Sequence, residues 1–113
     1  MVSTAKLKPG DRVRAIRELT GLNQREFAEA LGVDITLLKN IEYKRNRVTE
    51  SFYEIIGRTF PEMLPWFVYE GPLTLDSLRN SKSSLCKVAA ARIDAGFIPA
   101  GFFSEDIFKD GNQ

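Results

Sequence analysis

The stretch QREFAEALGVDITLLKNIEY, residues 24–43, contains the pattern that decides how this chain folds. Its apolar residues recur three and four positions apart, which is the spacing of one buried face of an α-helix. Asn23, just before the stretch, and Asp34 within it are residue types that cap helix N-termini, and Gly32 suits the left-handed residue that ends a helix. The stretch therefore predicts two short helices joined by a three-residue turn.

Each of these two helices has an apolar face and a polar face. The expected buried positions are Phe27, Ala28, Leu31, Leu37, Leu38 and Ile41. The positions expected on the other side of the second helix are Ile35, Thr36, Lys39 and Asn40. A helix that packs by one face leaves the opposite face available for a ligand.

Helical spacing also dominates the rest of the chain, and no alternating run of apolar and polar residues predicts a sheet. The first helix is expected to have an arginine-rich outer face. The expected helix starts and ends include Pro9, Gly21, Thr49 and Pro61, and two further helices are expected over 64–69 and 84–95. The predicted fold class is therefore all-α.

The composition indicates one folded domain and offers little to a catalyst. Of the 113 residues, 43% are hydrophobic and 27% are charged, which is close to average globular usage. No apolar run is long enough to span a bilayer and residues 1–8 lack the apolar part of a signal peptide, so we expect a cytoplasmic protein. With no histidine and Cys86 as the one cysteine, we expect no enzyme activity, no metal site and no cofactor.

Charge is distributed unevenly along the chain, although the formal net charge is only +1. Residues 39–47 contain four basic residues and one acidic residue, Glu42, which is a local excess of three positive charges. Residues 50–70 contain four acidic residues against Arg58 alone. One end of the domain is therefore expected to be electropositive.

Two small residues make the 24–43 stretch more specific than its apolar spacing alone. Ala28 stands where a small side chain lets two helices cross closely, and Gly32 stands at the turn. The other matching positions are Phe27, Leu31, Val33, Leu38 and Ile41, with Leu22-Asn23-Gln24 before them and Ile41-Glu42 at the end. In this register, about residues 7–71 resemble the Cro/repressor class of regulators, the XRE family. The resemblance implies a five-helix helix-turn-helix DNA-binding domain at 1–71 and a helical extension at 72–113.

The resemblance also implies roles for individual residues. The base-reading residues would be Ile35, Thr36, Lys39 and Asn40. The phosphate contacts would be Gln24, Tyr43, Lys44, Arg45, Asn46 and Arg47. Arg17 and Glu42 match positions that form a partly buried ion pair between the first and third helices. The chain departs from the family pattern at Lys44, where glycine is usual, at Asp34, which brings negative charge near phosphate, and at Ile35, which replaces a polar residue.

The function implied by the resemblance is sequence-specific transcriptional regulation through double-stranded DNA. We expect a repressor that binds a palindromic operator as a homodimer, in the control region of a phage, prophage or mobile element. The apolar row expected to form the dimer or to hold a second protein is Leu85, Ala89, Ile93 and Phe97. An activating role stays open, as does a function of another class, a protein-interaction module such as an antitoxin.

The end of the chain is rich in large apolar side chains. They are Phe97, Ile98, Phe102, Phe103, Ile107 and Phe108. Such residues complete the protein's own core, join two copies, or hold a second protein. Among these alternatives we rank self-association first.

Overall fold

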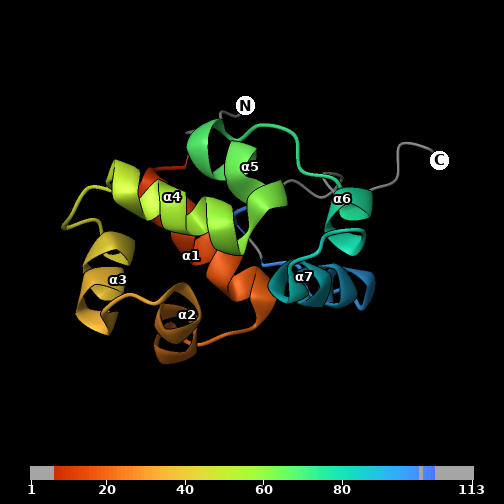
Figure 1. Cartoon of the computed structure of the whole chain (residues 1–113), viewed down its shortest axis with the longest axis horizontal. Coiled ribbons are helices and arrows are strands. Elements are labelled where there is room, and N and C mark those ends of the chain that lie inside the picture. The colour runs from red at the N-terminus through yellow and green to blue at the C-terminus, as the bar shows by residue number, and fades with distance from the viewer. Residues whose placement is uncertain (1–6, 100, 104–113) are drawn as a thin grey trace.

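The computed structural model describes residues 7–99 and 101–103, and in these residues it contains helices and no strand (Figure 1). The α-helices are α1 (Pro9–Thr20), α2 (Gln24–Leu31), α3 (Ile35–Glu42), α4 (Glu50–Thr59), α5 (Leu64–Tyr69), α6 (Leu75–Arg79) and α7 (Ser84–Asp94), with a 3-10 turn, η1 (Pro61–Met63), before α5. The predicted all-α class is confirmed. The sequence pattern predicts no separate helix at the position of α6.

Local capping explains where α2 and α3 begin and end. The Asn23 side chain accepts a hydrogen bond from the backbone N–H of Glu26 at 2.8 Å, and the Glu26 carboxylate accepts one from the Asn23 N–H at 3.0 Å. Gly32 adopts φ 74° where α2 ends, a conformation that is accessible to glycine without a steric penalty. Asp34 then accepts a hydrogen bond from the Thr36 N–H at 2.7 Å and starts α3. These caps leave three residues between the two helices, which is the turn length that the sequence predicts.

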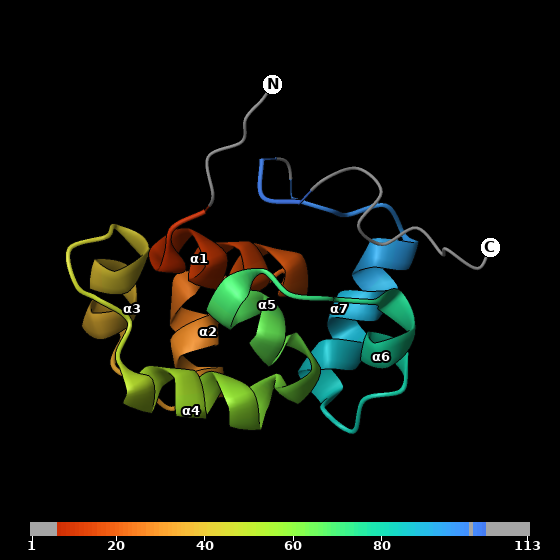
Figure 2. The same cartoon turned by 90° about the horizontal axis from the view of Figure 1, so that it is seen from above.

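The helices surround one hydrophobic core. Figure 1 shows α4 in front of α1, and Figure 2 shows α2 and α5 between these two helices. The rings of Phe27 and Phe60 stack in the core with their centroids 5.8 Å apart, and Ile16 and Ile56 are fully buried in the same core. In both views α3 lies at one end of the molecule with α2 next to it, while α6 and α7 lie at the other end.

Helices α6 and α7 complete this core and do not stand apart from it. Ala89 and Ile93 belong to the same buried cluster as the α1 residues, and the Arg92 Nε donates to the Leu19 carbonyl at the end of α1 at 3.1 Å. The expectation that the row on this helix forms a dimer or partner surface is therefore wrong for Ala89 and Ile93, which are 0% and 7% exposed. In that row Leu85 is half-buried, and only Phe97 is largely exposed.

Two side chains lie on the opposite side from the one expected. Leu37 was expected to face the core but is 39% exposed, because an eight-residue helix buries only one face and Leu38 and Ile41 occupy it. The sequence predicts an arginine-rich outer face for the first helix, but one arginine of α1, Arg12, is only 7% exposed. Its Nε donates to the Phe67 carbonyl in the last turn of α5 at 2.6 Å, where a cation also offsets the negative end of the helix.

After α7 the chain turns back toward α1 and α5. Gly96 and Gly101 both adopt φ 90°. Phe103 then stacks on Trp66 with the ring centroids 4.9 Å apart, and Phe102 lies under the Arg14 guanidinium at 5.9 Å. These two aromatic residues therefore complete the protein's own packing, which is one of the alternatives that the sequence left open. Ile107 and Phe108 lie outside the described residues.

A close approach between backbones connects α1 to α3. Gly10 is buried in the first turn of α1, and a Cβ atom built on it would lie 2.2 Å from the Ile41 carbonyl oxygen. Real Cβ atoms do not come this close to backbone atoms, so any larger residue must push the C-terminal end of α3 away from α1.

We expect Gly10→Ala to destabilise the protein by about 1–3 kcal/mol, because α3 must move to admit the methyl group. The matched control is Gly57→Ala in α4, where the new Cβ would meet only a flexible Leu64 methyl at 3.2 Å. Chemical unfolding measures both variants. A Gly10→Ala protein that is as stable as Gly57→Ala would contradict the close approach.

Candidate nucleic-acid interface

One face of α3 points away from the core and carries polar side chains. Thr36 and Lys39 are exposed, while Ile35 and Asn40 are half-buried at the two edges of this face. Tyr43, at the end of the helix, is 56% exposed. It lies seven residues after Thr36, which places it on the same face. The structure thus gathers the four expected base-reading residues on one side of α3 and adds Tyr43 to them.

The end of α3 is a C-capping motif that places Lys44 in a strained conformation. The Arg45 N–H donates to the Asn40 carbonyl at 2.8 Å and the Lys44 N–H donates to the Ile41 carbonyl at 3.0 Å, which is the hydrogen-bond pattern of a Schellman motif. Lys44 occupies the left-handed position of this motif with φ 62°. Glycine is preferred there because a Cβ atom disfavours the conformation.

The loop after α3 carries three basic side chains, of which Lys44 lies toward α1 and Arg45 lies against Tyr43. Lys44 Nζ lies 3.0 Å from the Asp11 Oδ1 on α1. The Arg45 guanidinium lies 5.6 Å from the centre of the Tyr43 ring. Asn46 and Arg47 are exposed. Positive charge therefore accumulates at the C-terminal end of α3, where it also offsets the negative end of the helix.

Asp11 is the acidic residue that faces this basic loop. Burial alone raises the pKa of its carboxyl group, but the hydrogen bond from Lys44, the backbone N–H of Lys8 and the charges of both lysines outweigh burial. The pKa of Asp11 is therefore lower than its ordinary value. The carboxylate stays ionised at neutral pH and holds the Lys44 side chain toward α1.

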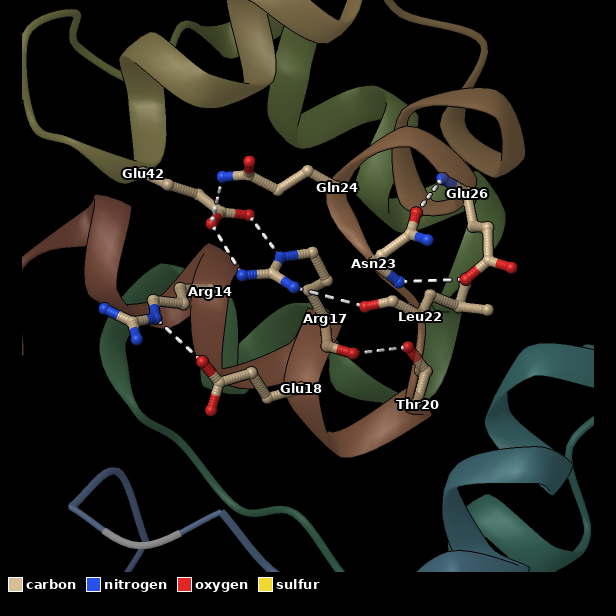
Figure 3. A network of polar contacts seen from close by, with 9 residues as sticks. All are labelled: Arg14, Arg17, Glu18, Thr20, Leu22, Asn23, Gln24, Glu26 and Glu42. Atoms are coloured by element: carbon tan, nitrogen blue, oxygen red, sulfur yellow. Dashed lines mark hydrogen bonds and ion pairs between the residues drawn. The ribbon is translucent and has the colours of Figure 1, made fainter.

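A buried ion pair joins α3 to α1 (Figure 3). The Arg17 Nε donates to the Glu42 Oε2 at 2.8 Å, and the Arg17 Nη2 donates to the Glu42 Oε1 at 3.0 Å. The two side chains are 14% and 1% exposed. This is the contact that the family resemblance implied for these two residues. Glu42 is the last residue of α3, where a carboxylate opposes the helix dipole, so the bidentate arginine compensates both burial and position.

Gln24 takes part in the same network. Its Nε2 donates to the Glu42 Oε1 at 3.1 Å, and a third nitrogen of Arg17 donates to the Leu22 carbonyl at 3.2 Å (Figure 3). The side chain expected to contact phosphate is therefore engaged inside the protein. It borders an open pocket, which we call the α1–α3 pocket, lined by Arg14, Arg17, Asn23, Gln24, Glu42 and Tyr43.

Three residues of this region were not assigned roles from the sequence. Gly10 allows α3 to approach α1, Asp11 holds Lys44, and Arg14 borders the α1–α3 pocket. The four-residue spacing of Arg14 and Glu18, whose ion pair is 2.7 Å long, was readable as a helical pair. The contacts of Gly10 and Asp11 join segments far apart in the sequence, so no local pattern could reveal them.

In the described ranges no three Cys, Asp or Glu side chains gather as metal ligands. The Cys86 side chain is buried in the core, and burial raises the pKa of its thiol. Within the same part of the chain, no helix has both the length and the apolar content that crossing a membrane requires.

Comparisons with protein-family models, with curated protein sequences and with solved structures find no match to this chain.

Exchanging Lys44 tests the strained C-cap of α3. Lys44→Gly and Lys44→Ala both remove the contact with Asp11, but only glycine relieves the left-handed backbone. We expect Lys44→Gly to be about 1 kcal/mol more stable than Lys44→Ala in chemical unfolding. Equal stabilities of the two variants would show that residue 44 is not held in the left-handed conformation.

Removing Arg17 tests the buried ion pair. We expect Arg17→Ala to lose about 3 kcal/mol, because the Glu42 carboxylate then stays buried with one amide partner. The control is Arg14→Ala on the same helix, which breaks the exposed pair with Glu18 and should lose less than about 1 kcal/mol. The double variant Arg17→Met/Glu42→Leu should recover much of the loss, since it leaves no buried charge. Similar losses for Arg17→Ala and Arg14→Ala would contradict the burial of the pair.

Proposed function

We propose that this protein is a sequence-specific DNA-binding transcriptional regulator. The observation that carries the proposal is the exposed polar face of α3, which a buried ion pair holds rigidly against α1 and which ends in a basic loop. An α-helix fits the major groove of DNA and presents its exposed side chains to base edges. A helix that reads bases must be held in a defined orientation, because small displacements break the hydrogen bonds that distinguish one base from another.

The residues on the exposed face of α3 have suitable chemistry for reading bases. Asn40 pairs with adenine through two hydrogen bonds, and Thr36 donates to a base edge or contacts a thymine methyl group. Lys39 suits guanine or phosphate, and Ile35 suits a thymine methyl. The edge position of Ile35 and Asn40, both half-buried, restricts the orientations of their side chains.

The basic loop and the α1–α3 pocket have suitable chemistry for holding the phosphate backbone. The cationic loop residues are Lys44, Arg45 and Arg47, with Asn46 between them. Gln24 reaches a phosphate by exchanging its bond to Glu42 for a bond to the phosphate oxygen, since the carboxylate keeps Arg17 as its partner. Tyr43 and Arg45 lie against each other beside the pocket. Such contacts set the position of the protein along the duplex and the strength of binding. They do not depend directly on the base sequence.

We assign α2, the three-residue turn and α3 to a helix-turn-helix of the Cro/repressor class, with α1, α4 and α5 as its supporting helices. The pattern of small and apolar residues supports this assignment, and so does the capped turn between the two helices. The proposed reader is α3, the second helix of the motif.

We further propose a homodimer that represses transcription by occupying a palindromic operator, in the cytoplasm and in the control region of a phage, prophage or mobile element. One α3 reads only a few base pairs, and a two-fold dimer doubles the site. Ala89 and Ile93 are buried in the chain's own core and take no part in such a dimer. Measuring the molecular mass in solution tests the dimer.

Alanine variants separate base reading from phosphate contact. We expect Thr36→Ala and Asn40→Ala to cost about 1–3 kcal/mol on an operator selected from a random-sequence pool, with little change on unselected DNA. Arg45→Ala and Arg47→Ala should weaken binding to both duplexes alike. Each should also flatten the slope of log affinity against log salt by about 0.9 per lost phosphate contact. Titrations of each variant at several salt concentrations measure both effects.

The parent protein provides the test of the whole proposal. If it binds no duplex at low salt, the DNA-binding function is wrong and the alternative of a protein-interaction module takes its place. Equal losses for Asn40→Ala and Arg45→Ala on both duplexes would contradict the separate roles of α3 and the loop.

A further inference from the structure

The chain after α7 returns to the side of α1 that borders the α1–α3 pocket. Arg14 is the residue that connects the two regions. Its guanidinium lies 5.9 Å from the centre of the Phe102 ring, and the same side chain lines the α1–α3 pocket together with Gln24 and Tyr43. Residues 14 and 102 are therefore in contact although most of the chain separates them.

Two contacts hold the Arg14 side chain in place. Its Nε donates to the Glu18 carboxylate at 2.7 Å, and the Phe102 ring covers the guanidinium. Phe103 anchors the segment that carries Phe102, because its ring stacks on the buried Trp66 at 4.9 Å. The side chain of Arg14 is nevertheless 54% exposed, so its charge stays accessible from solvent.

We infer that residues 101–103 position Arg14 at the α1–α3 pocket through the ring of Phe102, so that Arg14 contacts a phosphate of bound DNA. This inference rests on the proposed function. Arg14 is then a further phosphate-binding residue, and Phe102 is a positioning residue that acts through it. A flexible arginine loses rotamer freedom when it binds, and a ring that already holds its guanidinium reduces that loss.

The arrangement gives the C-terminal segment a role in DNA affinity without contact between the segment and DNA. Phe97 provides the internal comparison, because its ring also lies under an arginine, Arg92, at 5.1 Å. Arg92 donates to the Leu19 carbonyl and lines a different pocket with Phe97. We therefore expect a substitution of Phe102, and not one of Phe97, to weaken the contact with phosphate.

The experiment measures binding of the full chain to a mixed-sequence duplex of about 24 base pairs, roughly two helical turns, over a range of salt concentrations. Phosphate contacts do not depend on sequence, so no operator is needed. The variants are Arg14→Ala, Phe102→Leu, Phe102→Tyr, Phe97→Leu and the double variant Arg14→Ala/Phe102→Leu. Thermal unfolding of each variant confirms that it is folded at the temperature of the binding measurement.

We expect Arg14→Ala to reduce the slope of log affinity against log salt by about 0.9. Phe102→Leu keeps apolar volume but removes the ring, and should weaken binding about threefold with an unchanged slope, while Phe102→Tyr should bind as the parent does. In the Arg14→Ala background, Phe102→Leu should have no further effect. Phe97→Leu should bind as the parent does.

Three results would overturn the inference while leaving the proposed function intact. They are an unchanged salt slope for Arg14→Ala, an equal effect of Phe102→Leu with and without Arg14, and a loss at Phe97→Leu as large as at Phe102→Leu. If the parent protein binds no duplex at low salt, the proposed function itself fails and the inference fails with it.

Discussion

The carboxylate of Glu42 lies almost without solvent exposure at the negative end of α3, a position in which an unpaired charge would be strongly unfavourable. Two nitrogens of Arg17 compensate it from α1, and the Gln24 amide adds a hydrogen bond from α2. One acidic side chain therefore joins three helices. Because the guanidinium and the carboxylate match in only a narrow range of geometries, the pair determines both the distance and the angle at which α3 lies against α1.

Helix α1 supports the molecule on several sides. Toward α3 it offers the bare backbone of Gly10 and the carboxylate of Asp11. Toward α5, the buried Arg12 of α1 donates a hydrogen bond to a backbone carbonyl. The last turn of α1 accepts a hydrogen bond from Arg92 of α7. Any change that displaces α1 must therefore disturb the exposed face of α3 and the C-terminal packing together, since the core between them is closely packed.

The C-terminal third of the chain has a structural role that its sequence did not make clear. Its apolar row predicts a surface for a partner, because an exposed apolar helix face is typical of an interaction site. The structure instead buries Ala89 and Ile93 against α1, so the two-part division of the chain at residue 71 does not divide its core. Phe102 and Phe103 extend the same packing to Arg14 and Trp66.

The sequence by itself determined the all-α class, most of the helices and the caps of α2 and α3, because spacing and capping act over a few residues. The Arg17–Glu42 contact came from a family resemblance and matches the structure. Only the tertiary structure decided that Leu37 faces solvent, that Arg12 is buried and that Gly10 meets Ile41. Each of these depends on which face a neighbouring helix covers, and residues far apart in the chain determine that coverage without leaving a local pattern.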